Sequence, residues 1–322
     1  MRKFSVIIPI YNRPDELQEL LESLTQQSYT NFEIIVIEDG SMLKCDTVCE
    51  FYKDKLDIKY FYKENGGQGF ARNFGFEKAS GDYFVQLDSD AIVPDTYFEI
   101  VNTEIDKHGL DAYGGPDAAH VSFTPTQKAI NYAMTSFLTT GGTRGKSKNL
   151  GGKFHPRSFN FGLSRKVWEK VGGYKITRMG EDIEFSIRII EAGFKVELIP
   201  AAFIYHKRRT SLSQFYKQLF FFGRARVNIW RFFPKELKMV HLFPVAFTLF
   251  IWSLAFQYLM FPILFYLSFA LLLIFVLANF VKASIENKSL KVGILAIPAS
   301  LIQLFAYGMG FIKEMFLSSE KN

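Results

Sequence analysis

The chain of 322 residues lacks charge over two long stretches. No Asp, Glu, Lys or Arg occurs in residues 239–281, a run of 43 positions, or in residues 292–312, a run of 21. A membrane-crossing helix needs about 20 apolar residues. The first run is therefore long enough for a hairpin of two spans with its turn near residues 257–262, and the second for a third span. The alternative is a buried helical subdomain of a soluble protein, although such long uncharged runs exceed what soluble cores usually contain.

Cysteine is also scarce, and no secretory leader is evident. Only Cys45 and Cys49 occur, and no further metal-ligand pattern surrounds them. The first ten residues superficially resemble a signal peptide, but their apolar run is short, Pro9 interrupts it and no small-residue cleavage site follows. We therefore expect a first strand here, a catalytic part that stays on the cytoplasmic side of the cytoplasmic membrane, and two free thiols.

Acidic residues are nearly absent from the segment before the first uncharged run. Residues 207–238 contain nine Lys or Arg and one acid, Glu236, which gives this segment a net charge of +8, whereas the whole chain carries +6. A basic cluster beside a membrane run indicates anionic lipid head groups rather than nucleic acid as the partner. Residues 211–238 mix these cations with aromatic and aliphatic residues. They predict an amphipathic segment in the membrane interface with its apolar side toward lipid, or simply the positive flank of the first span.

Two common phosphate-binding patterns are missing. Arg72 stands where a dinucleotide fingerprint requires its third glycine, and Thr140 stands where a P-loop requires its first glycine. Residues 141–152 instead predict a mobile loop. Its three cations either close on a diphosphate or are solvated.

What is present in the first 210 residues is an alternation of strand and helix signals, typical of an α/β layered sheet. Apolar runs predict buried strands over residues 4–9, 33–37, 58–62 and 83–87. Three polar clusters follow strands: Tyr11–Arg13, Glu38–Ser41 and Asp88–Asp90. Because such sheets bind ligands at the carboxyl ends of their strands, we expect these clusters to meet at one edge.

Asp88 and Asp90 are the most informative pair. Side chains two residues apart in extended backbone point the same way, so both carboxylates reach one point in space. A divalent ion that bridges phosphates needs one or two carboxylates, and substrate oxygens complete its shell. The alternative is a solvated turn, because Asp and Ser favour turns. The expected convergence of three clusters favours the metal site.

Two further groups are candidates. Glu181 and Asp182 open a predicted helix, where they serve chemistry or only complement the helix dipole. His206 follows a strand-like stretch beside three cations. It completes a metal shell, touches a diphosphate or is a structural histidine.

Five motifs in order resemble the family 2 glycosyltransferases, which have the GT-A fold. They are Val6-Ile7-Ile8-Pro9-Ile10-Tyr11-Asn12, Glu38-Asp39-Gly40-Ser41, Gly69-Phe70-Ala71-Arg72-Asn73, Asp88-Ser89-Asp90 and Gly180-Glu181-Asp182. Each motif alone is weak, but the ordered set covers about residues 3–210. The fold expected is a Rossmann-like mixed α/β sheet followed by C-terminal transmembrane helices.

The resemblance implies inverting transfer of a sugar from a nucleotide diphosphate sugar, UDP- or GDP-linked. It also implies a role for each matched residue. Pro9, Tyr11, Asn12, Glu38, Asp39, Arg72 and Asp88 would line the donor site, Asp88 and Asp90 would bind Mg²⁺ or Mn²⁺, Glu181 and His206 would lie on the acceptor or diphosphate side, and Asp182 would be the catalytic base. Glu38 departs from the aspartate usual at its position, which leaves the nucleotide open.

The sequence thus predicts a metal-dependent, multi-pass membrane glycosyltransferase of cell-envelope polysaccharide synthesis. Its expected parts are a catalytic domain over 1–210, the interfacial segment over 211–238 and a membrane domain over 239–322 with two to three spans. The expected acceptor is a lipid-linked glycan. One alternative is a processive polysaccharide synthase, although the Gln-x-x-Arg-Trp motif usual in such enzymes is absent, since Phe221 and Phe222 follow Gln218 at its Arg and Trp positions. The other is an inactive, nucleotide-sugar-binding membrane scaffold.

Overall fold

The computed structural model describes residues 2–118, 123–141 and 154–317. By its internal contacts the chain forms two compact units. The first, here called the sheet unit, comprises Met1–His120 and Phe154–Lys207, and the second, the helical unit, comprises Val121–Lys153 and Arg208–Asn322. The chain therefore leaves the sheet unit within its sequence and returns to it.

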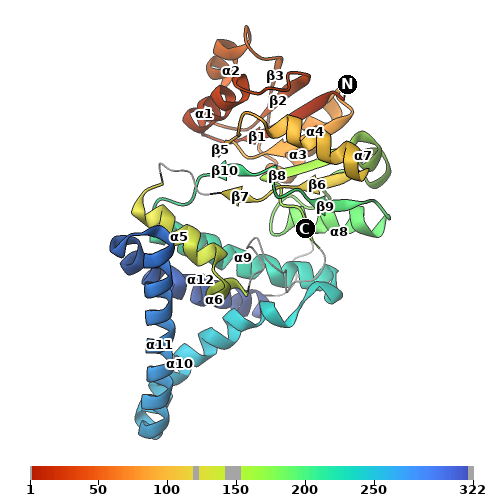
Figure 1. The fold of residues 1–322 in the computed structure, drawn as a ribbon. Helices are drawn as coiled ribbons and strands as arrows, with labels where there is room; N and C mark the ends of the chain where they lie inside the picture. Colours follow the sequence, from red (N-terminus) through yellow and green to blue (C-terminus); the bar gives the residue numbers. More distant parts are fainter. Residues whose placement is uncertain (1, 119–122, 142–153, 318–322) are drawn as a thin grey trace. The chain divides into compact units, whose positions relative to one another are not determined.

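The sheet unit is built on a mixed sheet of seven described strands in the order β3-β2-β1-β4-β8-β6-β9 (Figure 1). The pairs β1–β2, β2–β3 and β1–β4 are parallel, and β8 is antiparallel to β4 and β6. The strands are β1 (Phe4–Ile10), β2 (Phe32–Asp39), β3 (Ile58–Lys63), β4 (Tyr83–Leu87), β6 (Ala112–Gly114), β8 (Asn160–Ser164) and β9 (Val196–Leu198). The four strands predicted from apolar runs are confirmed.

Helices cover both faces of this sheet, which explains the uninterrupted apolar runs. In β1 successive side chains alternate between two cores: Val6 and Ile8 pack in one, and Ile7 packs in the other. The helices of the unit are α1 (Pro14–Thr25), α2 (Asp46–Tyr52), α3 (Gln68–Lys78), α4 (Tyr97–His108), α7 (Arg165–Val171) and α8 (Glu181–Glu191). Pro14 begins α1, where a proline costs no hydrogen bond.

A second, three-stranded sheet adjoins the end of β4. Its order is β5-β10-β7, formed by β5 (Ala91–Ile92), β10 (Ile204–His206) and β7 (Asp117–Ala118). β10 runs antiparallel to β5 and parallel to β7. The Asp88–Asp90 segment therefore lies between β4 of the main sheet and β5 of the small one.

The helical unit contains α5 (Pro125–Thr135), α6 (Phe137–Thr140), α9 (Leu212–Phe232), α10 (Phe243–Met260), α11 (Pro262–Asn287) and α12 (Leu290–Phe316), with short 3₁₀ turns at Pro234–Glu236 and Met239–His241. Within the described residues, three helices are long and apolar enough to cross a membrane: Met239–Met260, Pro262–Asn287 and Leu290–Phe316. The two helices of the predicted hairpin are confirmed, and the turn between them falls at Phe261.

The basic segment folds as a helix, α9, but its apolar side has protein partners. Phe215 and Leu219 are buried in a cluster with Ala299 and Ala306 of α12 and with residues of α5. The prediction that this apolar side faces lipid is therefore wrong for Phe215 and Leu219, because α12 supplies the apolar surface that a bilayer was expected to supply.

The two cysteines are free, as predicted, and both are buried. Burial, followed by the charge of Glu38, raises the pKa of both thiols, that of Cys49 to about 12. Neither is a reactive thiolate near neutral pH.

Candidate active site

The three predicted polar clusters meet at the carboxyl edge of the sheet. β1, β2 and β4 are parallel neighbours, so their carboxyl ends lie side by side. The Asn12 backbone N–H donates to the Ser41 hydroxyl at 2.8 Å, which joins the first cluster to the second. Arg13 Nη1 donates to Asp90 Oδ2 at 3.1 Å, which joins the first to the third. The expected convergence is confirmed.

Asn12 holds the loop that follows β2. Its backbone is in the left-handed region, with φ of 55°, a conformation that asparagine tolerates better than most residues. Its side-chain oxygen accepts hydrogen bonds from the backbone N–H groups of Met42 at 2.8 Å and Leu43 at 3.0 Å. The neighbouring Tyr11 ring is half-exposed, and Pro9 lies within β1 opposite Ile37.

Asp39 and Glu38 end β2 with different surroundings. Asp39 accepts from the backbone N–H groups of Gly66 at 2.9 Å and Gly67 at 2.8 Å, so it orders the glycine turn before α3. Glu38 is fully buried, and its carboxylate accepts from the Cys45 N–H at 2.7 Å. The structure thus places Glu38 inside the protein. Any influence of Glu38 on a bound donor would be indirect, through the position of the loop after β2 that it holds at Cys45.

Asp88 and Arg72 form an ion pair at the end of β4. Arg72 Nη2 donates to Asp88 Oδ1 at 2.7 Å. The guanidinium is fully buried and lies 5.8 Å from the centre of the Tyr174 ring. Its Nε and Nη1 have no hydrogen-bond acceptor within the described part of the chain. Buried donors without acceptors are rare in folded proteins, and an anionic ligand would satisfy them.

Asp90 lies beside Arg13 and the small sheet. Its backbone carbonyl accepts from the Lys207 N–H at 3.2 Å, and β10 pairs the backbone of His206 with Ala91. The backbone of β10 is therefore adjacent to the carboxylate pair. The His206 side chain lies outside the described part of the structure, as do most of residues 141–152.

The donor set at this edge fits a hard divalent ion. Asp88 and Asp90 contribute carboxylate oxygens from positions two apart, and their side chains are 30% and 11% exposed. Within the described residues no group of three or more His, Cys, Asp or Glu gathers to form a complete cage. Mg²⁺ is typically held by one or two carboxylates and completed by water and substrate phosphates, so two carboxylates beside an unsatisfied buried guanidinium suit an ion–diphosphate pair.

Glu181 begins α8 and is buried. The Gln68 side-chain amide donates to its Oε1, and the Gly180 N–H donates to Oε2 at 3.2 Å. Burial and then the charge of Asp182 raise the pKa of Glu181 to about 7, against the opposing effect of Arg72. The carboxyl group therefore changes charge near neutral pH, within the electrostatic range of the Arg72–Asp88 pair.

Asp182, the predicted base, is partly exposed next to an arginine. Its Oδ2 lies 3.6 Å from Arg157 Nη1, and its Oδ1 accepts from the Ile183 N–H at 2.8 Å. The second contact is a helix-start hydrogen bond of the kind that the dipole favours. The first places the carboxylate beside a cation, with 17% of its side chain exposed.

Two site neighbours escape sequence reasoning: Gln68 on Glu181 and Arg157 on Asp182. Gln68 stands next to a recognised motif, so its position was a usable signal. Arg157 is 25 residues before its partner in the chain, and no local pattern marks it.

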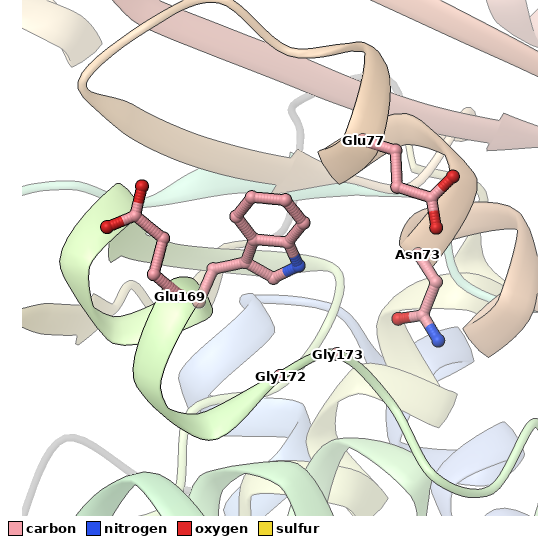
Figure 2. Close-up of a pocket in the computed structure, with 6 residues that line it drawn as sticks. Asn73, Glu77, Glu169, Gly172 and Gly173 are labelled. Atoms are coloured by element: carbon pink, nitrogen blue, oxygen red, sulfur yellow. The ribbon is translucent and has the colours of Figure 1, made fainter.

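A hollow of about 430 Å³ lies away from these residues, between α3 and α7. Asn73, Glu77, Trp168, Glu169, Gly172 and Gly173 line it. Figure 2 shows Asn73 and Glu77 on one side and Glu169 on the other. Two carboxylates at its border make it unsuited to a diphosphate, and the Asn73 side chain is already bonded to the Tyr174 backbone.

The fold and the carboxylate edge are those of a nucleotide-sugar transferase class, and comparison with known proteins agrees. Residues 5–172 match the family model described as Glycosyl transferase family 2. This is more than half of the chain, and the chain belongs to that family.

Similar named proteins include glycosyltransferases of two bacteria. An uncharacterised glycosyltransferase of Rickettsia typhi is 48% identical over 86 residues, which cover 27% of this chain and 26% of that protein. The chain thus aligns with about a quarter of that relative's length. The uncharacterised glycosyltransferase YibD of Escherichia coli is 26% identical over 255 residues, or 74% of this chain and 70% of YibD.

A solved structure shares the fold over nearly the whole chain. The mannosyltransferase PcManGT of Pyrobaculum calidifontis, solved in complex with GDP-Man and Mn²⁺, superposes with a TM-score of 0.61 at 15% identity. The match covers 98% of this chain and 87% of PcManGT. At this identity the likeness establishes the GT-A fold, with the helical part included in the match.

Proposed function

We propose that the protein transfers a sugar, with inversion, from a nucleotide diphosphate sugar to a lipid-linked glycan at the cytoplasmic face of the membrane. The observation that carries the proposal is the cluster at the carboxyl edge. There the Asp88–Arg72 pair, the Asp90–Arg13 pair and the Glu181–Asp182 helix start lie together in one unit. Family membership supplies the reaction class.

On the donor side, Asp88 and Asp90 would hold Mg²⁺ or Mn²⁺, which supplies positive charge for the diphosphate leaving group. The buried N–H groups of Arg72 that lack acceptors would donate to phosphate oxygens as charge builds there. Asn12 fixes the loop at Met42–Leu43, and Asp39 fixes the glycine turn. Both loops are thereby preorganised beside the half-exposed Tyr11 for the nucleoside.

On the acceptor side, Asp182 would take the proton of the attacking hydroxyl. A sugar hydroxyl has too high a pKa to ionise alone, so its proton leaves in the transition state to a positioned carboxylate. Arg157 at 3.6 Å would orient the Asp182 carboxylate. A single base opposite the leaving group gives one displacement and therefore inversion at the anomeric carbon.

The donor test uses the full chain in detergent with a panel of UDP- and GDP-linked sugars. We expect release of nucleoside diphosphate from one donor, dependent on Mg²⁺ or Mn²⁺. The GDP-Man and Mn²⁺ of PcManGT make that pair the first to test. Asp88→Asn should lose this activity, whereas Asp54→Ala, an exposed acid in the same unit, should keep it. Binding of a donor without turnover of any acceptor would instead favour the inactive scaffold.

The lipid-linked acceptor is proposed from the apolar hairpin. Trp252, Phe256, Leu259 and Ile263 are exposed on α10 and α11, and soluble monomers rarely expose such continuous apolar surface. A membrane-held enzyme meets a lipid diphosphate acceptor by diffusion in two dimensions. Vesicles that contain a polyprenyl diphosphate sugar should be glycosylated faster than a water-soluble short-chain analogue. Equal rates with the two acceptors would contradict a lipid-linked acceptor. Addition of many sugars to each acceptor would favour a processive synthase.

A further inference from the structure

The helix α12 has the length and composition of a membrane span but not the surroundings of one. Of the 18 most apolar consecutive residues of α12, 44% are buried by protein, compared with 6% for the helix that contains α10 and 11% for α11. No residue from 295 to 312 is exposed. A helix that is apolar all round is either a span or the centre of a protein core, and protein contacts account for the apolarity of α12.

One partner of α12 is the basic helix α9. A Cβ atom on Gly223 of α9 would lie 2.0 Å from the Tyr307 carbonyl oxygen, and a Cβ on Gly310 of α12 would lie 2.0 Å from that of Phe220. The two backbones are therefore in direct contact. Because α9 also carries Lys217, Arg224, Arg226 and Arg231, it does not lie in hydrocarbon, and α12 shares its environment.

The C-terminal end of α12 is tied to the chain that precedes the hairpin. The Glu314 carboxylate accepts from Arg224 at 2.7 Å and from Arg231 at 3.0 Å. Arg231 also donates to the Leu317 carbonyl at 2.7 Å. Only eleven residues, 232–242, separate Arg231 from the start of α10, and they form two 3₁₀ turns.

The hairpin meets α12 at its open end. Ser300 donates to Asn279, near the end of α11, at 3.2 Å, and Thr248, near the start of α10, donates to the Phe305 carbonyl at 3.3 Å. Within the helical unit, Figure 1 shows α10 and α11 meeting at one end while α12 lies across the other.

We propose that α12 is not a membrane span: the hairpin α10–α11 alone enters the bilayer, and α12 lies across its open end at the membrane surface, in contact with α9. A spanning α12, which begins at Leu290, would carry Glu314 about 36 Å from its start, to the opposite face. Arg231, which is bonded to Glu314, would then lie at that opposite face as well. Residues 232–242, with Lys235, Glu236 and Lys238, would then have to return through hydrocarbon.

Charge placement agrees with two crossings. With α12 at the surface, the Lys and Arg residues described between 208 and 317 lie on one side of the bilayer, as the positive-inside rule requires. A spanning α12 would instead put Lys313, and with Glu314 its partner Arg231, on the other side. The surface left for acyl chains is the closed half of the hairpin, where Leu259 is 76% and Ile263 is 79% exposed.

The test is the sidedness of the two ends of α12 in the full chain. Lys235→Cys, Lys291→Cys and Lys313→Cys replace side chains that are exposed before α10, at the start of α12 and at its end. A membrane-impermeant maleimide is applied to inverted and to right-side-out vesicles, and detergent gives the total for each variant. The unaltered chain is the background, because Cys45 and Cys49 are buried.

We expect all three variants to be labelled from the same side. Labelling of Lys313→Cys from the side opposite to Lys291→Cys would overturn the proposal and establish α12 as a third span. Met315→Cys, at a position 46% exposed at the same end of α12, repeats the measurement without removing Lys313, whose ammonium lies over the Phe220 ring.

Discussion

The amino and carboxyl edges of the main sheet differ in how completely their buried charged groups are hydrogen-bonded. At the amino edge, the fully buried Glu33 carboxylate accepts from Lys59 at 2.6 Å, from the Ser5 hydroxyl at 2.6 Å and from the Ser80 N–H at 2.6 Å. At the carboxyl edge, Arg72 is as deeply buried, yet two of its nitrogens have no acceptor among the described residues. The hydrogen bonds of the buried charge are complete at one edge, whereas at the other edge two buried donors lack acceptors among the described residues.

The buried glutamates of the two edges titrate accordingly. Burial alone would raise the pKa of Glu33, but the hydrogen bonds from Lys59, Ser5 and Ser80 outweigh it and lower that pKa to about 2. Burial and Asp182 together raise the pKa of Glu181 to about 7. A buried carboxylate whose hydrogen bonds are all made supports the fold, whereas a buried carboxyl group with a pKa near 7 is typical of a functional site.

The largest effect should come from the carboxyl edge. Asp90→Ala removes one metal ligand and the partner of Arg13, so we expect metal-dependent donor binding to be lost. Calorimetry of nucleoside diphosphate binding, with and without Mn²⁺, measures this, and Asp54→Ala is the matched control. Unchanged Mn²⁺-dependent affinity in the Asp90 variant would show that the metal is held elsewhere.

Asp182→Asn keeps the shape and the helix-start hydrogen bond but removes the base. Transfer should slow by about 10²–10⁴-fold, while donor affinity stays as in the unaltered chain. The exposed Glu191→Gln at the other end of α8 controls for loss of helix charge. A decrease of less than about tenfold in a folded Asp182 variant would assign Asp182 to the helix dipole.

Glu33→Gln tests the opposite edge and should affect stability rather than chemistry. The lowered pKa corresponds to about 3 kcal/mol in favour of the ionised form, and loss of charged hydrogen bonds typically costs about 1.5–3 kcal/mol. This stability is present above the unfolded pKa of 4.5 and is lost as the pH falls toward 2. Thermal unfolding in detergent should show a lower melting temperature than the unaltered chain at pH 7 and a smaller difference below pH 4. A loss of transfer by the folded variant would contradict the contrast between the edges.

The smallest effect is expected from Glu181→Gln. As the pH rises through about 7, Glu181 gains a negative charge near Arg72, and the donor diphosphate should bind several-fold more weakly. The glutamine variant should keep the low-pH affinity throughout. The measurement is the donor KM between pH 6 and 8, and the same pH profile in both proteins would show that another group titrates.

Much of the sheet could be predicted because its strands are buried on both faces and therefore read as apolar runs. The same holds for the edge cluster, since parallel strands bring their carboxyl ends together wherever the loops lead. The free thiols and the hairpin turn also followed from local sequence.

Some long-range partners could not be predicted. Gln68 donates to Glu181 and Arg157 lies beside Asp182, and both contacts form only after folding. The lipid contact expected of Phe215 and Leu219 in α9 was wrong, because the apolar pattern of these residues fits lipid and α12 equally well. Hydropathy records that a surface is buried from water, and it does not record what covers it.

The segment Val121–Lys153 between β7 and β8, which contains α5, belongs to the helical unit, and this affects any truncation of the protein. α5 packs Ile130 and Met134 with α9 and α12, and its Tyr132 hydroxyl donates to Asn279 of α11 at 3.2 Å. A cut after residue 207 would leave α5 attached to the sheet unit without these neighbours. The helical unit is thus formed by two separate segments of the chain, one of which interrupts the sequence of the sheet unit. A version without the C-terminal helices would require α5 to be redesigned as well.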